Sequence, residues 1–254
     1  MSFVSVSQQD AVRTIRLERP DARNALNTAL LGELLDVIGE AVSAPEVRAV
    51  VLTGAGTTFS SGADLREVLD AGATTRRMEL FGQLFEAVVT SSTPTIAAVS
   101  GHCVGGGAEL AAACDIRVAD ATASFRFPGA AVGYPVGAAK LVGLVGLGAA
   151  KDLVLSGRRV LADEAARIGL VQRLVADGGA MATALELGGQ IAQNDPATVR
   201  HLKRLFEQFS GLSDRVAVES DALLALARAE GDYAAITPPD HGVGSWAGGH
   251  HQAR

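Results

Sequence analysis

Cysteine, basic charge and long apolar runs are all scarce in this sequence, and each shortage excludes some classes of protein. The 254 residues include two cysteines, Cys103 and Cys114. They have no metal-ligand spacing and cannot form a disulfide framework, so we expect both to be small buried apolar side chains. No apolar stretch reaches about 18 residues, and no basic segment precedes an apolar one at the start. We therefore expect neither a membrane span nor a signal peptide. The expected location is the cytoplasm.

Basic residues are outnumbered by acidic ones. The chain has 22 lysines and arginines against 28 aspartates and glutamates, which gives a net charge of −6. A mildly acidic chain is a poor nucleic-acid binder, although a local basic spot could still hold a small polyphosphate. Hydrophobic residues make up 48% of the chain, which excludes the disordered and fibrous classes. At this length, one large domain or two small ones can bury a core unaided.

Short apolar strands alternate with helices over the first half of the chain. A hairpin is expected from Val4 to Leu17, and apolar spacing predicts a helix over residues 28–43, with Asn27 or Thr28 as its N-cap. Further strands are expected at residues 47–53, 95–100, 115–119 and 124–127. Further helices are expected between them, at residues 64–69, 75–91 and 108–114. This alternation is typical of right-handed βαβ units and predicts a mostly parallel sheet.

Helices dominate the second half of the chain. They are expected at residues 137–148, 149–156, 162–168, 179–194, 196–209 and 213–230, with one strand at 170–175. We therefore expect an α/β core over residues 1–195 and a C-terminal helical region over residues 196–236. Residues 237–254 are rich in proline, glycine and histidine and are expected to form a flexible tail.

Two glycine-rich loops each follow a strand and precede a helix. One runs from Ser60 to Leu65, and the other from Gly101 to Leu110. In an open parallel sheet, ligands bind at the carboxyl ends of the strands, so these loops would aim backbone N–H groups into one crevice. Two such donors would suit a developing oxyanion. The alternative is that the glycines only pack helix against strand, and the spacing does not fit a dinucleotide fingerprint.

Glu109 is the carboxylate of most interest. It lies near the start of the predicted helix at residues 108–114, beside the second loop. In one interpretation it only compensates the helix dipole, and in the other it is a general acid or base next to the oxyanion loop.

The loops also carry specific motifs. F-S-S-G-A-D-L at 59–65 together with G-H-C-V-G-G-G-A-E-L-A-A-A-C-D at 101–115 resembles the crotonase family, also called the enoyl-CoA hydratase/isomerase superfamily. The segments R-P-D-A-R-N-A-L-N at 19–27 and L-S-G-R-R-V-L-A-D-E-A-A-R-I-G-L-V at 155–171 are similar to that family too, and the resemblance covers roughly residues 3–230. It implies an α/β fold, a spiral of ββα units, with a C-terminal helical region that builds homotrimers or dimers of trimers.

The resemblance also implies a ligand and a site. The ligand is an acyl-CoA thioester, with no cofactor beyond the coenzyme A carried on the substrate, no metal, no nucleic acid and no membrane. The implied oxyanion donors are the N–H groups of Ala63 and Gly106, with Glu109 as the proton-transfer group. The implied residues along the coenzyme A moiety are Arg23, Ala25, Ser61, Ala63, Asp64, Leu65, Val104 and Gly106.

One position departs from the pattern of the hydratases. Their second glutamate corresponds to Gly129 here, and the family's isomerases commonly keep that carboxylate. Members that lack it include a decarboxylase of a methylmalonyl-type thioester, in which a downstream tyrosine matters, and Tyr134 lies in a comparable stretch. The leading hypothesis is therefore hydration of, or double-bond movement in, a 2-enoyl-CoA. The alternatives are decarboxylation or hydrolysis of a substituted acyl-CoA, or acyl-CoA binding without turnover. Lys140 is expected at the surface or an interface, and His102 at the loop surface.

Overall fold

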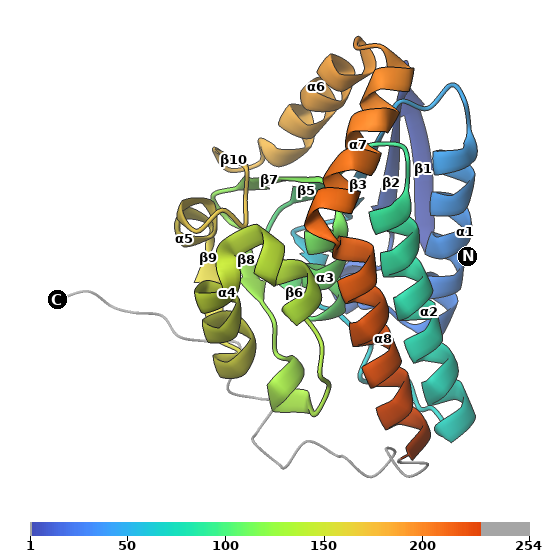
Figure 1. Cartoon of the computed structure of the whole chain (residues 1–254), viewed down its shortest axis with the longest axis vertical. Helices are drawn as coiled ribbons and strands as arrows, with labels where there is room; N and C mark the ends of the chain where they lie inside the picture. Colours follow the sequence, from blue (N-terminus) through green and yellow to red (C-terminus); the bar gives the residue numbers. More distant parts are fainter. Residues whose placement is uncertain (1, 230–254) are drawn as a thin grey trace, which may run out of the picture.

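Two sheets form the centre of the protein in a computed structural model, which describes residues 2–229 (Figure 1). The larger has six strands in the order β1-β2-β3-β5-β7-β10. β1 and β2 are the expected antiparallel hairpin, and every other neighbouring pair in this sheet is parallel. Its strands are β1 (Val4–Gln9), β2 (Val12–Leu17), β3 (Ala49–Gly54), β5 (Thr95–Val99), β7 (Ile116–Asp120) and β10 (Arg173–Val175).

A second, four-stranded sheet was not predicted from the alternation. It has the order β4-β6-β8-β9. Its strands are β4 (Thr58–Ser60), β6 (His102–Val104), β8 (Ser124–Arg126) and β9 (Arg159–Leu161). β4, β6 and β8 each follow a strand of the larger sheet after a short turn, so the repeating unit is ββα, as in the spiral fold that the resemblance implied.

Eight α-helices surround the sheets within the described residues. They are α1 (Thr28–Ser43), α2 (Ala71–Thr90), α3 (Gly106–Ala113), α4 (Ala138–Ser156), α5 (Ala162–Arg167), α6 (Ala180–Ala192), α7 (Pro196–Ser210) and α8 (Leu212–Ala229). The Asn27 side chain caps α1 by accepting a hydrogen bond from the Leu30 N–H at 3.0 Å. Residues 137–148 and 149–156, expected as two helices, form the single element α4, which is kinked at Gly146.

The core has two parts, one on each side of the larger sheet. The larger part includes the apolar faces of α1, α2 and α3, and the smaller one is formed where α6 covers β3, β5 and β7. Cys103 and Cys114 are both buried free thiols, as predicted. α8 lies along α2 (Figure 1), which brings the C-terminal helical region against the core. The expected tail at residues 237–254 lies outside the described residues.

The prediction of a helix at residues 64–69 is wrong. This segment forms turns, in which the Asp64 carboxylate accepts a hydrogen bond from the Arg66 N–H at 3.1 Å, and the next helix begins only at Ala71. Asp64 is therefore not a helix cap. Among the described helices, none combines the length and the apolar character that a bilayer crossing requires.

Candidate active site

The two glycine-rich loops leave neighbouring parallel strands of the small sheet. β4 pairs with β6 in parallel, with Thr58 opposite His102 and Ser60 opposite Cys103. The carboxyl ends of parallel neighbours meet at one edge of a sheet. The loop after β4 and the turn from β6 into α3 therefore begin side by side.

The loops are also in contact, at Gly62. A Cβ atom on Gly62 would lie 2.6 Å from the Val104 carbonyl oxygen and 3.2 Å from the Gly106 nitrogen. The φ angle of Gly62 is +87°, which side-chain-bearing residues rarely adopt. Only glycine lets the first loop approach the start of α3 this closely.

Hydrogen bonds around Ala63 orient its main chain. The Leu26 N–H donates to the Gly62 carbonyl at 2.8 Å, and the Asp64 N–H donates to the Leu26 carbonyl at 3.0 Å. In such a parallel bridge, the residue between these two groups turns its own N–H to the other side. Gly106 is the first residue of α3, so its N–H is among the four that no carbonyl inside the helix can accept.

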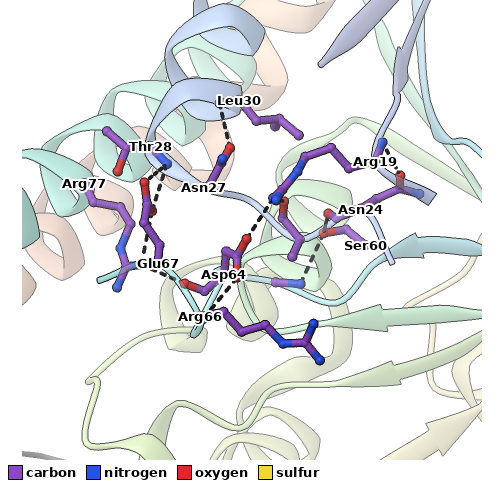
Figure 2. A network of polar contacts seen from close by, with 12 residues as sticks. Arg19, Asn24, Asn27, Thr28, Leu30, Ser60, Asp64, Arg66, Glu67 and Arg77 are labelled. Atoms are coloured by element: carbon purple, nitrogen blue, oxygen red, sulfur yellow. Dashed lines mark hydrogen bonds and ion pairs between the residues drawn. The ribbon is translucent and has the colours of Figure 1, made fainter. Parts of the chain in front are cut away.

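A buried asparagine holds the first loop in place (Figure 2). Asn24 is fully buried, and its amide nitrogen donates to the carbonyls of Ala55 at 2.9 Å and Thr58 at 2.7 Å. The Ser60 hydroxyl donates to the Asn24 carbonyl at 2.8 Å and accepts from the Gly62 N–H at 3.1 Å. These bonds tie the loop's backbone to the segment that precedes α1.

Charged side chains fix the part of the loop beyond Ala63, as Figure 2 shows. The Arg19 guanidinium lies 2.9 Å from the Asp64 carboxylate, and Arg77 of α2 donates to the Asp64 carbonyl at 3.1 Å. Glu67 accepts a hydrogen bond from the Thr28 N–H at 3.0 Å and lies 3.5 Å from Arg77. Asp64 is thus engaged by the protein itself.

Glu109 lies in the first turn of α3 and is only 3% exposed. Its carboxylate is 3.0 Å from the Nζ atom of Lys140 on α4, and that ammonium is 2.9 Å from the carboxylate of Glu219 on α8. The Nζ atom also lies 4.4 Å from the centre of the Phe85 ring. The prediction that Lys140 lies at the surface or an interface is wrong, because its side chain is enclosed between two carboxylates and an aromatic ring.

The surroundings shift the pKa values of this buried pair. Burial raises the pKa of Glu109, the neighbouring Lys140 charge opposes this rise, and Glu219 adds to it. Burial works against the charge of Lys140, but the two carboxylates outweigh it and raise the pKa of Lys140. Lys140 therefore stays an ammonium, while the raised pKa makes the Glu109 carboxylate a stronger base than an ordinary glutamate, which suits proton transfer.

Position 129 has no room for a side chain. A Cβ atom on the buried Gly129 would lie 2.6 Å from the Tyr134 carbonyl oxygen and 3.0 Å from that of Val136. The turn is closed by a hydrogen bond from the Tyr134 N–H to the Gly129 carbonyl at 2.9 Å. A glutamate could occupy this position only if the backbone moved.

We predict that Gly129→Ala lowers the free energy of unfolding by about 1–3 kcal/mol, because the new methyl group meets main-chain atoms. Gly39→Ala is the matched control, since a Cβ there has nothing within 4 Å and the position is inside α1. The control is expected to gain about 0.5–1 kcal/mol. Urea unfolding measures both, and equal stabilities of the two variants would contradict the prediction.

Basic residues lie beside the second loop. His102 is exposed, as expected for the loop surface, and its Nδ1 atom is 3.1 Å from the Ser124 hydroxyl. Burial and then the charges of Arg159 and Arg23 lower the pKa of His102. Both arginines are exposed, so this side of the loop presents positive charge to solvent in a protein of net negative charge.

The remaining predicted residues lie in the two loops, in the segment before α1, and, for Tyr134, in the turn after Gly129. Leu65 is 71% exposed and Ala25 is buried. Ser61, Val104 and Tyr134 are half-buried. Lys140, Glu219 and Asn24 were not identified from the sequence as parts of this region.

An α/β spiral of ββα units, with paired glycine-rich loops beside a buried glutamate, defines the class of protein. A family model described as enoyl-CoA hydratase/isomerase matches residues 7–225. The chain is 38% identical to the short-chain-enoyl-CoA hydratase of Clostridium acetobutylicum over 210 residues, which cover 80% of each chain. The chain belongs to the enoyl-CoA hydratase/isomerase family, the crotonase superfamily.

Solved structures agree with this assignment. The enoyl-CoA hydratase from Bacillus anthracis superposes with a TM-score of 0.79 at 31% identity, covering 89% of this chain and 90% of that one. A monofunctional enoyl CoA isomerase from M. smegmatis superposes with a TM-score of 0.70 at 32% identity, covering 84% of this chain and 94% of that one. The same fold is thus found in both hydratases and isomerases.

Proposed function

We propose that the protein acts on an acyl-CoA thioester through an enolate. The main-chain N–H groups of Ala63 and Gly106 bind the thioester oxygen, and Glu109 transfers the proton. The contact of the two loops at Gly62 is the observation that carries the proposal. The Gly106 nitrogen would lie 3.2 Å from a Cβ atom on Gly62, and Gly62 is the residue directly before Ala63. Two preorganised donors of this kind stabilise a developing oxyanion by about 3–4 kcal/mol each.

The proposed chemistry needs one carboxyl group. In double-bond movement, the Glu109 carboxylate takes the proton between the carbonyl and the double bond. The electron pair moves to the thioester oxygen, and the resulting acid returns the proton to the far carbon. In hydration, the same carboxylate accepts a proton from the water that attacks C3 and delivers it to C2. The crowding at Gly129 supports a site that works without a second glutamate there.

The coenzyme A moiety is proposed to lie along the two loops. Its phosphates would face the exposed arginines Arg23 and Arg159, whose charges both act on His102. Ala25, Ser61, Leu65 and Val104 would border the rest of it. Asp64 contributes by holding the loop, since Arg19 occupies its carboxylate.

Tyr134 supports a second candidate function, decarboxylation. It is half-buried and closes the turn at Gly129, where the hydratases carry their second glutamate. Loss of CO₂ from a malonyl-type thioester leaves its electron pair on the same enolate, and the α-carbon then takes up a proton. This route needs the oxyanion donors but no base to begin. Hydrolysis, or binding without turnover, remains the further alternative.

One set of assays tests the proposal on the purified protein. Crotonyl-CoA is expected to lose its enoyl absorbance on hydration, and a 3-enoyl-CoA to gain it on isomerisation. CO₂ release from a malonyl-type thioester would support the second candidate instead. Binding of CoA esters in calorimetry without any of these changes would indicate a binding protein. Failure to bind CoA esters at all would refute the proposal.

A further inference from the structure

We infer that Lys140 and Glu219 are positioning residues that together set the charge of Glu109. The inference rests on the proposed function only in giving Glu109 a role in catalysis. The three side chains come from different helices, α3, α4 and α8, and lie in one row, with the ammonium 3.0 Å from one carboxylate and 2.9 Å from the other. Two carboxylates therefore compete for a single buried cation.

The row of Glu109, Lys140 and Glu219 has two carboxylates and one ammonium, so its charges do not cancel. With all three groups ionised, the row carries one net negative charge, although solvent reaches only 1% of the Lys140 side chain, 4% of that of Glu109 and 9% of that of Glu219. A buried net charge is costly, so the row favours an additional proton on Glu109. How strongly Glu109 holds that proton depends on how strongly Lys140 is drawn to Glu219. Glu219 thereby acts on Glu109 through Lys140.

Within the part of the chain that the structure describes, the charges that act on Glu109 are those of Lys140 and Glu219. α2, which also packs against α3, contributes aromatic side chains here: Phe81 lies against Gly106, and the Phe85 ring covers the ammonium.

The nearby arginines are directed elsewhere. Arg215 of α8 donates to the Ala139 carbonyl at 3.0 Å, next to Lys140. Arg117 of β7 donates to the carbonyl of Cys114 at 2.6 Å, beyond the C-terminal end of α3. Glu109 is in the first turn of that helix, so Lys140 is the cation bound to it.

Glu219 is held rigidly enough to play this part. Its second carboxylate oxygen accepts a hydrogen bond from the Ala139 N–H at 2.9 Å, so one side chain binds both the backbone and the side chain at the start of α4. A glutamine at position 219 keeps one acceptor oxygen for the Ala139 N–H, and it loses both the charge and the hydrogen bond from Lys140, because its other terminal group is an NH₂ donor. Glu219→Gln therefore keeps the backbone bond at the start of α4 and releases Lys140 from its second carboxylate.

Two variants are expected to move the pKa of Glu109 in opposite directions. Lys140→Met removes the cation that lowers this pKa, so it should rise further. Glu219→Gln removes the negative charge that raises it and leaves Lys140 to Glu109 alone, so it should fall. Lys140→Arg retains the cation, so the pKa of Glu109 in this variant should stay closer to that of the parent protein than in Lys140→Met. A purely structural role for the row would give no such reversal of sign.

The measurement is a ¹³C NMR titration of protein labelled at the glutamate carboxyl carbons, with the Glu109 signal assigned from its loss in Glu109→Gln. The acid limb of kcat/KM for crotonyl-CoA, where turnover is present, should move in the same directions. Shifts of the same sign in both variants, or no shift in either, would overturn the inference. If Lys140→Met does not fold, the sign of the shift in Glu219→Gln decides alone.

The two proposals fail separately. Opposite NMR shifts without turnover of any CoA ester would support the role of the row and refute catalysis. Turnover that depends on Glu109 but has an unchanged acid limb in Glu219→Gln would support the proposed function and refute this inference.

Discussion

Glu109→Gln is expected to lower turnover of the CoA-ester substrate by about 10²–10⁴-fold, the range for loss of a positioned acid–base group. Affinity for the ester should change little, because the thioester oxygen is proposed to bind main-chain N–H groups. The variant should still fold, since Lys140 keeps Glu219 as a partner at 2.9 Å and glutamine matches glutamate in shape.

Single-turnover rates and calorimetric affinities measure the two effects separately. Glu186→Gln is the control, because Glu186 is exposed on α6, which covers the other face of the larger sheet. A Glu109→Gln variant that retained full turnover would remove this residue from the chemistry. A variant that lost ester binding instead would assign it to recognition.

Gly62→Ala is expected to lower turnover by about 10²-fold or more, because displacing reacting groups by about 1 Å can cost that much. The new Cβ would lie 2.6 Å from the Val104 carbonyl oxygen, so the two loops must separate. The φ angle of +87° adds roughly 1–2 kcal/mol of backbone strain for alanine. Both effects should also lower the thermal unfolding temperature.

Gly178→Ala separates the strain from the contact. Gly178 has a φ of +74°, but nothing lies within 4 Å of a Cβ there. This control should lose stability from strain while its turnover stays that of the parent protein. Equal turnover in Gly62→Ala and Gly178→Ala would show that the separation of the loops does not govern the reaction.

The sequence was sufficient where structure depends on neighbours along the chain. The helix at residues 28–43 was predicted, with Asn27 or Thr28 as its cap, because the apolar spacing, Asn27 and Pro45 are all local signals. The segment 64–69 shows the limit of such signals. Its residues favour a helix, but Asp64 and Glu67 bind Arg19 and Arg77, which hold the segment in turns.

The second sheet and the buried lysine were missed for a related reason. β4, β6 and β9 have three residues each, too few for alternation to show, and they exist because they pair with one another or with β8. Lys140 follows small residues that suit an exposed helix. Its partners Glu109 and Glu219 are 31 and 79 residues away, so only the packing of three helices reveals that it is enclosed.

The distance between the two loops is a property of a backbone ladder. β4 and β6 hold each other through main-chain hydrogen bonds, as neighbouring strands do at roughly 4.8 Å. Side chains outside the contact at Gly62 can therefore vary without altering that distance. On the proposed function, such an architecture would let the choice of reaction diverge at positions such as Gly129 and Lys140, while the frame proposed to bind the thioester stays unchanged.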